Sequence, residues 1–386
     1  MPETEPRNTD DRVADESASD RLALQLGPLR LETPVISAPV AGFTDLLFRA
    51  VLREFGGCGL IYTEMVSAGG WIQGRIPPDR LNGVEGEPRP LGVQLWDREP
   101  EMIREAAARL ADLDISIIDL NFGCPKKRIM GKQGAGAKLL RDPATIGAMV
   151  AAAVEGSGGI PVTAKIRLGP SADEITAIDV VRAAADNGAV AVTVHGRTAA
   201  QNYSQPCDVD AIGEVVAASP IPVIANGDIA DAATARDTLE RSGAAAVMVA
   251  RTALSHPWVF REITAGLRRE PIPPPPTIGE QIDQLRRHHA SMVEQHGDPW
   301  GTVQMRKFAC RYLTGVPGAT DFRRAVSGAR DSEHFREILD HFFGAGGPLE
   351  EWVDRTVVPA NDDTPEEEAC SVESNERARG AGAGRA

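Results

Sequence analysis

The sequence predicts an α/β protein, a parallel (β/α)8 TIM barrel followed by a small all-helical domain. Short apolar runs alternate with longer amphipathic stretches eight times between residues 35 and 250. The apolar runs have no polar face, which is typical of strands buried on both sides of a parallel sheet. A proline-rich segment then separates this repeat from the rest of the chain. An open doubly wound sheet is the alternative that the same alternation allows.

The run at 115–121 illustrates how the strands are assigned. Ile115, Ile117 and Ile118 are β-branched, and Gly123 with Pro125 prevents the strand from continuing. By the same reasoning, strands are expected at 35–38, 59–64, 91–96, 115–121, 162–167, 191–195, 222–226 and 245–250. Apolar residues at helical spacing between them predict helices at 45–55, 99–110, 144–154, 174–187, 209–218 and 231–241.

Composition divides the chain into segments. No apolar run approaches the roughly 18 residues of a membrane helix, and the acidic start lacks the apolar centre of a secretory signal. We therefore expect a cytoplasmic protein without membrane association. The expected segments are a disordered acidic leader (1–21), the barrel (22–270), a Pro-rich linker (271–276), a helical domain (277–345) and a disordered tail (355–386).

The five cysteines are widely spaced and form no Cys-x-x-Cys pair. This pattern indicates neither a disulfide framework nor a metal site. Nothing in the sequence indicates an obligate protein partner, and we expect a monomer.

Charge is distributed unevenly. The net charge is −14, which taken alone argues against a nucleic-acid partner, because phosphate binding needs clustered Lys and Arg. Residues 302–330, however, hold six basic residues and one acid, a local charge of +5 that includes Arg306, Lys307 and Arg311. Such a run is either a solvated surface or a face that binds RNA.

Polar residues mark the ends of five predicted strands: Gln94, Asn121, Lys165, His195 and Asn226. The carboxyl ends of barrel strands meet on one face, where such enzymes keep their active sites. Any one of these residues alone has a second explanation as a strand-terminal cap. Five on different strands favour a site.

The two last strands carry a further signal. Asn226, Gly227 and Asp228 follow the seventh strand, and Ala250 with Arg251 follows the eighth. Loops at these places often bind phosphate through backbone N–H groups and helix N-termini. The alternative is a plain turn with an Asp cap. No strand leads into a Gly-x-Gly-x-x-Gly turn, so any nicotinamide would dock only transiently.

Cys124 lies where the fourth strand ends. A free cysteine is more often a small buried hydrophobe than a reactive group. The residues around it nevertheless belong to a larger pattern, which resembles the tRNA-dihydrouridine synthases, and the bacterial B subgroup in particular, from about residue 28 to about 330. The motifs that carry the resemblance are Pro39–Gly42 with Thr44-Asp45, Tyr62–Met65, Gln94, Asn121–Pro125, Gly134–Gly136, Lys165–Arg167, His195–Thr198, Asn226–Ile229 and, downstream, Arg306-Lys307, Tyr312, Gly315, Pro317-Gly318 and Arg323.

The resemblance implies an FMN-dependent reduction of the C5–C6 double bond of uridine in tRNA, with NADPH or NADH as transient reductant. Hydride would pass from flavin N5 to C6 and a proton from Cys124 to C5. A thiol suits that second step because its ordinary pKa, about 8.5, leaves it protonated at neutral pH. Lys126, Lys127 and Arg128 follow at once and would favour thiolate, so we expect them to point towards RNA phosphate.

The resemblance also implies roles for the other site residues. Val40 and Ala250 depart from the usual Met and Gly of the family, which affects the expected affinity for FMN. The implied cofactor contacts are Pro39, Val40, Ala41, Gln94, Lys165, His195, Asn226, Gly227, Asp228, Ala250 and Arg251, the implied base contacts are Asn121 and Arg197, and the implied tRNA contacts are Arg306, Lys307 and Arg311.

Two alternatives remain at this point. One is a flavin barrel oxidoreductase that acts on a small dihydropyrimidine or enone, which would leave the basic helical domain unexplained. The other is a catalytically silent tRNA-binding protein, against which Cys124, Lys165 and His195 argue.

Overall fold

The computed structural model describes residues 22–75, 81 and 83–357. The predicted leader and nearly all of the predicted tail lie outside these residues. The chain divides into two compact units between Pro274 and Pro275, inside the predicted linker.

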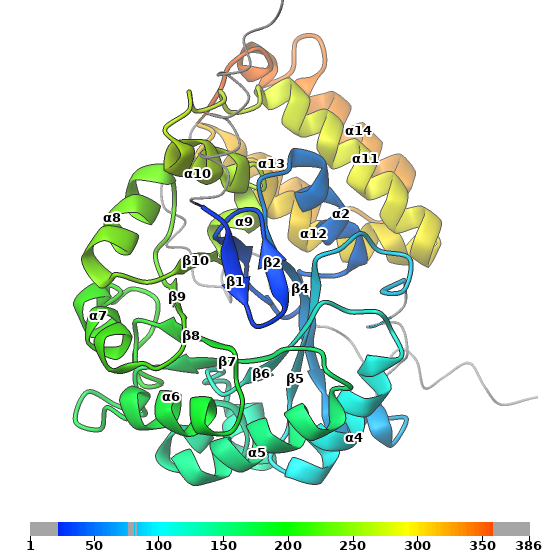
Figure 1. Cartoon of the computed structure of the whole chain (residues 1–386). Coiled ribbons are helices and arrows are strands. Elements are labelled where there is room, and N and C mark those ends of the chain that lie inside the picture. Colours follow the sequence, from blue (N-terminus) through cyan, green and yellow to red (C-terminus); the bar gives the residue numbers. More distant parts are fainter. Residues whose placement is uncertain (1–21, 76–80, 82, 358–386) are drawn as a thin grey trace, which may run out of the picture. The chain divides into compact units, whose positions relative to one another are not determined.

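The first unit is a closed barrel of eight parallel strands (Figure 1). Neighbours follow the order β3-β10-β9-β8-β7-β6-β5-β4. β3 and β4, which stand at the two ends of this order, are joined by a hydrogen bond from the Ser37 N–H to the carbonyl of Leu60, just before β4, at 2.9 Å. The sheet is therefore closed, which excludes the open doubly wound alternative. The strands are β3 (Val35–Ser37), β4 (Ile61–Ser67), β5 (Leu91–Trp96), β6 (Ile117–Asn121), β7 (Val162–Arg167), β8 (Ala191–His195), β9 (Val223–Asn226) and β10 (Ala246–Val249).

All eight predicted strands are confirmed, with small differences at their ends. The largest concerns β4, which starts two residues later than predicted and continues to Ser67. Its pairing with β5 shifts between Tyr62 and Met65, a bulge that the apolar pattern does not reveal. A short antiparallel hairpin, β1 (Leu24–Leu26) and β2 (Leu29–Leu31), precedes the barrel and was not predicted.

Helices surround the barrel, and the six that were predicted are all present. Asp45, Asp142, Asp208 and Asp231 each accept a backbone N–H at the start of a helix, as N-cap residues do. The helices are α2 (Leu46–Phe55), α3 (Ala68–Ile72), α4 (Pro100–Ala111), the π-helix η2 (Arg128–Gln133), the 3-10 helix η3 (Gly136–Arg141), α5 (Pro143–Gly156), α6 (Ala177–Asp186), α7 (Val209–Ala218), α8 (Ala232–Ser242), α9 (Thr252–Ser255) and α10 (Val259–Arg268).

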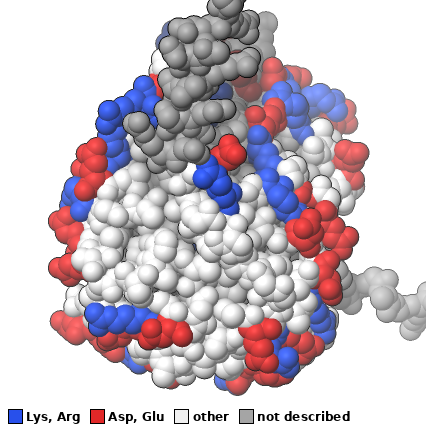
Figure 2. Space-filling view, in the orientation of Figure 1, with Lys and Arg blue, Asp and Glu red and all other residues white. Residues whose placement is uncertain are grey.

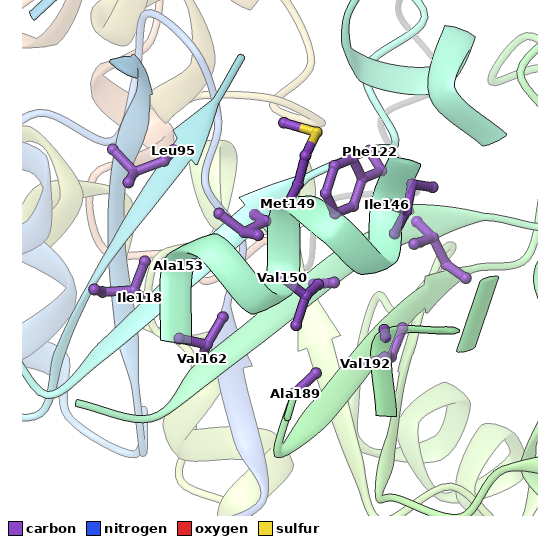
Figure 3. Close-up of a cluster of buried hydrophobic side chains, with 14 of the residues drawn as sticks. Leu95, Ile118, Phe122, Ile146, Met149, Val150, Ala153, Val162, Ala189 and Val192 are labelled. Carbon is purple, nitrogen blue, oxygen red and sulfur yellow. The ribbon is translucent and has the colours of Figure 1, made fainter. Parts of the chain in front are cut away.

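Two apolar layers hold this unit together. Outside the barrel, Ile118 and Val162 on the strands pack against Met149 and Val150 of α5 (Figure 3). Inside it, a second cluster fills the amino-terminal part of the barrel and reaches Met248 on β10 and Ala38 after β3. Its members alternate along the strands with the residues of the outer layer, as side chains of a strand must. The interior cluster includes Ile36, Tyr62, Ile117, Ala191, Ile224, Ala246 and Met248, with Leu24, Leu26 and Leu31 of the hairpin.

The hairpin therefore closes the amino-terminal end of the barrel. Gly92 makes room for this apolar filling, since a Cβ there would lie 2.3 Å from the Tyr62 ring. On the face that carries β1 and β2, charged side chains gather towards the edge and the middle is largely uncharged (Figure 2).

The second unit consists of helices, as predicted. Phe322 makes edge-to-face contacts with Phe342 and Phe343 at 5.6 and 5.4 Å and joins two of them. The Ile278 N–H donates to the Arg355 carbonyl, so the unit continues past residue 345, where we predicted its end, to at least Arg355. Its helices are α11 (Ile278–His296), α12 (Trp300–Tyr312), α13 (Ala319–Ser327), α14 (Ser332–Phe343) and the 3-10 helix η4 (Glu350–Trp352).

None of the helices in the described part of the chain combines the length and the apolar character needed to cross a membrane.

Candidate active site

The five polar strand-end residues meet inside the carboxyl end of the barrel, opposite the hairpin. Strand register aligns Asn121 with Lys165, and His195 with Asn226. The Asn121 Nδ2 donates to Gln94 Oε1 at 2.8 Å, and the Lys165 Nζ donates to Asn226 Oδ1 at 2.7 Å. The interior of the barrel thus changes from apolar to polar along the same strands.

Asp119 belongs to this group and was missed by the sequence analysis. Its side chain is 0% exposed and accepts from Gln94 Nε2 at 2.6 Å and from Thr163 Oγ1 at 2.7 Å. Burial is the main cause that raises the pKa of Asp119 to about 6. Its position two residues before Asn121 on one strand was the signal that could have identified it.

Cys124 lies on a loop whose backbone is held from several sides. Asn121 Oδ1 accepts the Gly123 and Cys124 N–H groups at 3.1 and 3.0 Å. Arg167 Nε donates to the Gly123 carbonyl at 3.1 Å. The half-buried thiol side chain packs beside a small apolar cluster that contains Met65. Cys124 is therefore at the rim of the site rather than in the core.

Cations inside the barrel act on the Cys124 thiol, and its sequence neighbours do not reveal them. Lys126, Lys127 and Arg128 are exposed, whereas Cys124 interacts electrostatically with Lys165 and Arg167 from the neighbouring strand. Charges that favour thiolate therefore come from inside the barrel. Sequence adjacency did not reveal this because β6 and β7 are joined by a helix.

Lys165 is half-buried in the interior. Burial and then the nearby Arg167 lower its pKa to about 8, against the opposing effects of Asp119 and Cys124. A bound anion would reverse part of this shift, because it favours the charged ammonium.

His195 is surrounded by positively charged side chains. Burial and four cations lower its pKa well below the usual range, so the ring is neutral near pH 7. Arg197 can only donate, and its Nη1 lies 3.2 Å from His195 Nε2, which must then be the acceptor. The four cations are Arg167, Lys165, Arg197 and Arg251.

Arg197 is buried, and its guanidinium is held by the loop around it and by Asp228. Its side chain is 1% exposed, and it donates to the Gln205 carbonyl at 2.6 Å and to both Asp228 carboxylate oxygens at 2.8 and 2.6 Å. These bonds hold the loop and Asp228, and the expected contact of Arg197 with a base stays a prediction.

The turn after β9 has the shape expected of an anion-binding loop, but Asp228 has another role. Gly227 has φ +125°, and a Cβ there would lie 2.6 Å from Cys207 Sγ. The Asp228 carboxylate faces Arg197 and Arg251, the latter at 3.1 Å, and accepts the Cys207 N–H. The Asp228 side chain therefore orients the two arginines. As a carboxylate it cannot donate a hydrogen bond to a bound phosphate.

Tyr203 is a second residue that the sequence analysis missed. Its half-buried ring lies 4.5 Å from the Arg251 guanidinium, 5.9 Å from those of Arg167 and Arg197, and stacks with His195 at 6.2 Å. Nothing in the polar loop around it predicts this placement. Cation–π contacts of this kind hold guanidinium groups without neutralising them.

The loop after β3 lies at the same end of the barrel. Val40 and Ala250 pack on the interior cluster, which brings together the two positions at which the chain departs from the resembled family. The Thr44 hydroxyl is bonded to the Val40 backbone, and the Gly42 N–H donates to Glu64 Oε2 at 2.6 Å. Pro39 is half-buried and Ala41 is exposed.

The three predicted tRNA contacts of the helical unit differ in exposure. Arg306 and Lys307 are half-buried, and Arg306 Nε donates to the Ala329 carbonyl at 2.7 Å. Arg311 is 5% exposed, much less than a direct tRNA contact leads one to expect, and its role in binding tRNA stays a prediction. Arg324 and Arg330 of the same basic run are exposed.

The sequence of the chain is similar to those of known proteins over most of its length. The chain is 36% identical to "Probable tRNA-dihydrouridine synthase" of Rickettsia prowazekii over 321 residues, 83% of this chain and 97% of the relative. It is 36% identical to the protein of that name from Mycobacterium tuberculosis, over 83% of this chain and 85% of the relative. It is 34% identical to "tRNA-dihydrouridine synthase B" of Xanthomonas axonopodis pv. citri, over 83% and 96%.

The family description "Dihydrouridine synthase (Dus)" matches residues 36–345, which include the whole interior site and most of the helical unit. The chain belongs to the dihydrouridine synthase family.

Proposed function

We propose that this protein is an FMN-dependent tRNA-dihydrouridine synthase, an oxidoreductase that reduces the C5–C6 double bond of uridine in tRNA. The observation that carries the proposal is the meeting of Asn121, Cys124, Lys165 and His195 at one end of a closed barrel. Family membership and the names of the relatives support the substrate.

The residues present fit FMN on two counts. Four cations act on one buried neutral histidine, His195, which favours an anionic group in their midst. The turn after β9 carries Gly227 at φ +125° and lies beside Arg251, so its backbone N–H groups and that guanidinium can both serve a phosphate. FMN, when bound, supplies the hydride for C6 of the uracil, and NADPH or NADH is the proposed transient reductant.

The chain's own groups would bind the cofactor from several elements. Lys165 and Arg251 supply charge, and His195 with Asn226 supplies neutral hydrogen-bonding groups. Gln94 would contact the cofactor through the hydrogen-bonding capacity that its bonds to Asp119 and Asn121 leave over. The proposed contacts from the loops are Pro39, Val40, Ala41, Gly227, Asp228 and Ala250, of which Asp228 acts through Arg251.

Cys124 is the proposed proton donor to C5. The S–H bond breaks as the C5–H bond forms, and the thiolate left behind is stabilised by Lys165 and Arg167. These cations also make proton loss easier, which suits a group that must give up its proton in each turnover. Asn121 holds the Cys124 N–H through Oδ1, and its Nδ2 donates to Gln94 Oε1 at 2.8 Å and lies 3.8 Å from Met65 Sδ; it is the proposed contact of the target base, which would replace the weak Met65 acceptor.

tRNA binding is proposed for the exposed basic residues near the thiol and in the helical unit. Lys127 and Arg128 lie directly after the Cys124 loop, and Arg324 and Arg330 are exposed on the helical unit. Arg306 and Lys307 remain proposed contacts. A uridine must leave its stack to reach the barrel interior, at a cost of a few kcal/mol, which phosphate contacts would offset. We further propose a cytoplasmic monomer.

The experiment that tests the proposal measures dihydrouridine in tRNA. Purified holoprotein, tRNA from cells that lack the gene, and NADPH should yield dihydrouridine at defined positions. The same tRNA pool should regain dihydrouridine when the wild-type gene is returned to the cells. An unchanged dihydrouridine content in the deletion strain would refute the proposed substrate, and activity on free dihydropyrimidines alone would favour the small-molecule oxidoreductase.

A further inference from the structure

Asp119 is buried at a position where an apolar residue would stabilise the barrel, and the attraction of Lys165 does not prevent burial from raising its pKa. Its two hydrogen-bond partners in the described part of the chain, Gln94 and Thr163, are neutral side chains. Ile117, two residues earlier on the same face of β6, shows the apolar alternative. Burying a carboxylate in this way costs several kcal/mol. Stability therefore does not account for the residue.

We infer that Asp119 is a positioning residue, whose carboxylate fixes the direction of hydrogen-bond donation from Asn121 through Gln94 and so turns the Asn121 amide oxygen towards the Cys124 N–H. This inference rests on the proposed role of Cys124, and it assigns the carboxylate no contact with cofactor or substrate.

The direction follows from the chemistry of the groups at the two ends. A carboxylate only accepts, so Gln94 must present Nε2 to Asp119 and Oε1 to its other neighbour. Asn121 must then donate from Nδ2 to that oxygen, at 2.8 Å. This leaves Asn121 Oδ1 as the acceptor for the N–H groups of Gly123 and Cys124, which can only donate. Each hydrogen bond in this series, from the Cys124 loop through Asn121 and Gln94, is therefore donated in the direction of the Asp119 carboxylate.

Strand register holds this series of hydrogen-bonded side chains in place. Gln94 lies opposite Asp119 in the pairing of β5 with β6, and Asp119 lies opposite Thr163 in the pairing of β6 with β7. Gln94 and Asp119 are 0% exposed, so water does not compete for their hydrogen bonds. A side chain that donated to Gln94 would reverse the chain and leave the Asn121 NH2 group facing two N–H donors.

Four variants separate this role from a general contribution to stability. Asp119→Leu removes the acceptor at similar volume. Thr163→Val removes the other hydrogen bond to the same carboxylate and leaves the chain intact. Asp119→Asn keeps the direction, because its amide oxygen can face Gln94 while its NH2 donates to the Thr163 hydroxyl, which reverses. In the double variant Asp119→Asn with Thr163→Val, that NH2 has lost its acceptor and is expected to turn to Gln94.

The main readout is amide hydrogen exchange of Gly123 and Cys124, which requires no tRNA. In Asp119→Leu and in the double variant these two amides should exchange about tenfold faster or more relative to the amides of β8, as expected for a lost hydrogen bond. Asp119→Asn and Thr163→Val should stay within about threefold of wild type. The double variant should therefore exceed the sum of its two singles.

Turnover of tRNA by the holoenzyme is the second readout. It should fall about tenfold or more in the two variants that lose protection, and not in the two single variants that keep it. Unchanged exchange at Gly123 and Cys124 in both Asp119→Leu and the double variant would overturn the inference, and so would lost protection with unchanged turnover. If wild-type protein failed to reduce tRNA, the proposed function would fail while the exchange result stood.

Discussion

The two ends of the barrel interior are built on the same strands and differ in nearly every property. At the amino-terminal end, Tyr62, Ile117 and Ala246 pack with the β1–β2 hairpin into an apolar cluster. At the carboxyl end, two or more residues further along each strand, Asp119, Asn121 and their neighbours form hydrogen bonds and carry charge. One end is filled for stability, and the other retains buried polar groups that lower stability.

The difference shows that the polar end depends on the apolar one. Buried cations and a buried carboxylate are costly to desolvate. A closed barrel with a packed apolar end restrains the strands that carry these groups, and its register, rather than flexible loops, sets their separations. Variants at matched positions of the two ends should therefore separate activity from stability.

The largest expected effect concerns a pair of thiols, one at each end. Cys124→Ala should lower turnover of tRNA by about 10² to 10⁴, the usual contribution of a positioned acid or base, while FMN remains bound and reducible by NADPH. Cys58→Ala is the control, since Cys58 donates to the Leu60 carbonyl just before β4, at the apolar end. It should lower the melting temperature and leave turnover unchanged. Near wild-type turnover in Cys124→Ala would reduce Cys124 to a packing residue.

The second effect concerns stability and uses the same strand. Ile117→Ala should lower the free energy of unfolding by about 2–5 kcal/mol through the lost methyl groups and the cavity left behind. Its turnover under conditions where the protein is folded should stay within about threefold of wild type. Denaturant titration and steady-state kinetics measure the two quantities. A large loss of turnover without a loss of stability would show that the apolar end takes part in the chemistry.

The third effect concerns the pH dependence of cofactor binding. Lys165 has a pKa of about 8 in the free protein, so its ammonium is present below pH 8 and is lost above it. Because an anion favours the charged form, the Kd for FMN should rise about tenfold per pH unit above 8. Fluorescence titration of apoprotein at several pH values measures this. Lys165→Met should bind FMN more weakly and with a flat profile; an equally steep profile would assign the dependence to another group.

The smallest effect concerns His288, which is a buried neutral histidine like His195 but belongs to the helical unit and not to the proposed site. Burial is the main cause that lowers the pKa of His288 to about 3. The unfolded chain then binds more protons between pH 6.5 and 3, so acid should destabilise the helical unit. Protection factors of α11 should fall about fivefold between pH 6.5 and 5.5, and less in His288→Gln. Protection that rose on acidification would contradict the assigned direction.

Much of the fold was predictable because its determinants are local. The apolar runs of β5 and β7 were predicted to the residue, since Leu91–Trp96 and Val162–Arg167 are bounded by turn-forming residues. The β1–β2 hairpin was not predicted, because its strands have three residues each and are fixed by contacts with the interior cluster. The β4 bulge also depends on pairing with β5 and leaves no local pattern.

The candidate site divides along the same line. The sequence by itself determined which chemical groups stand at the strand ends, because Asn121, Lys165 and His195 each lie at or near the end of a predicted strand, and these ends meet on one face of a parallel barrel. Only the tertiary structure decided what those groups contact. It directed Arg197 to Asp228 instead of outward, brought Tyr203 among three arginines, and joined Asp119 to the Cys124 loop. Periodicity fixes the side of a strand on which a residue lies, whereas hydrogen-bond partners depend on register between strands that are distant in the chain.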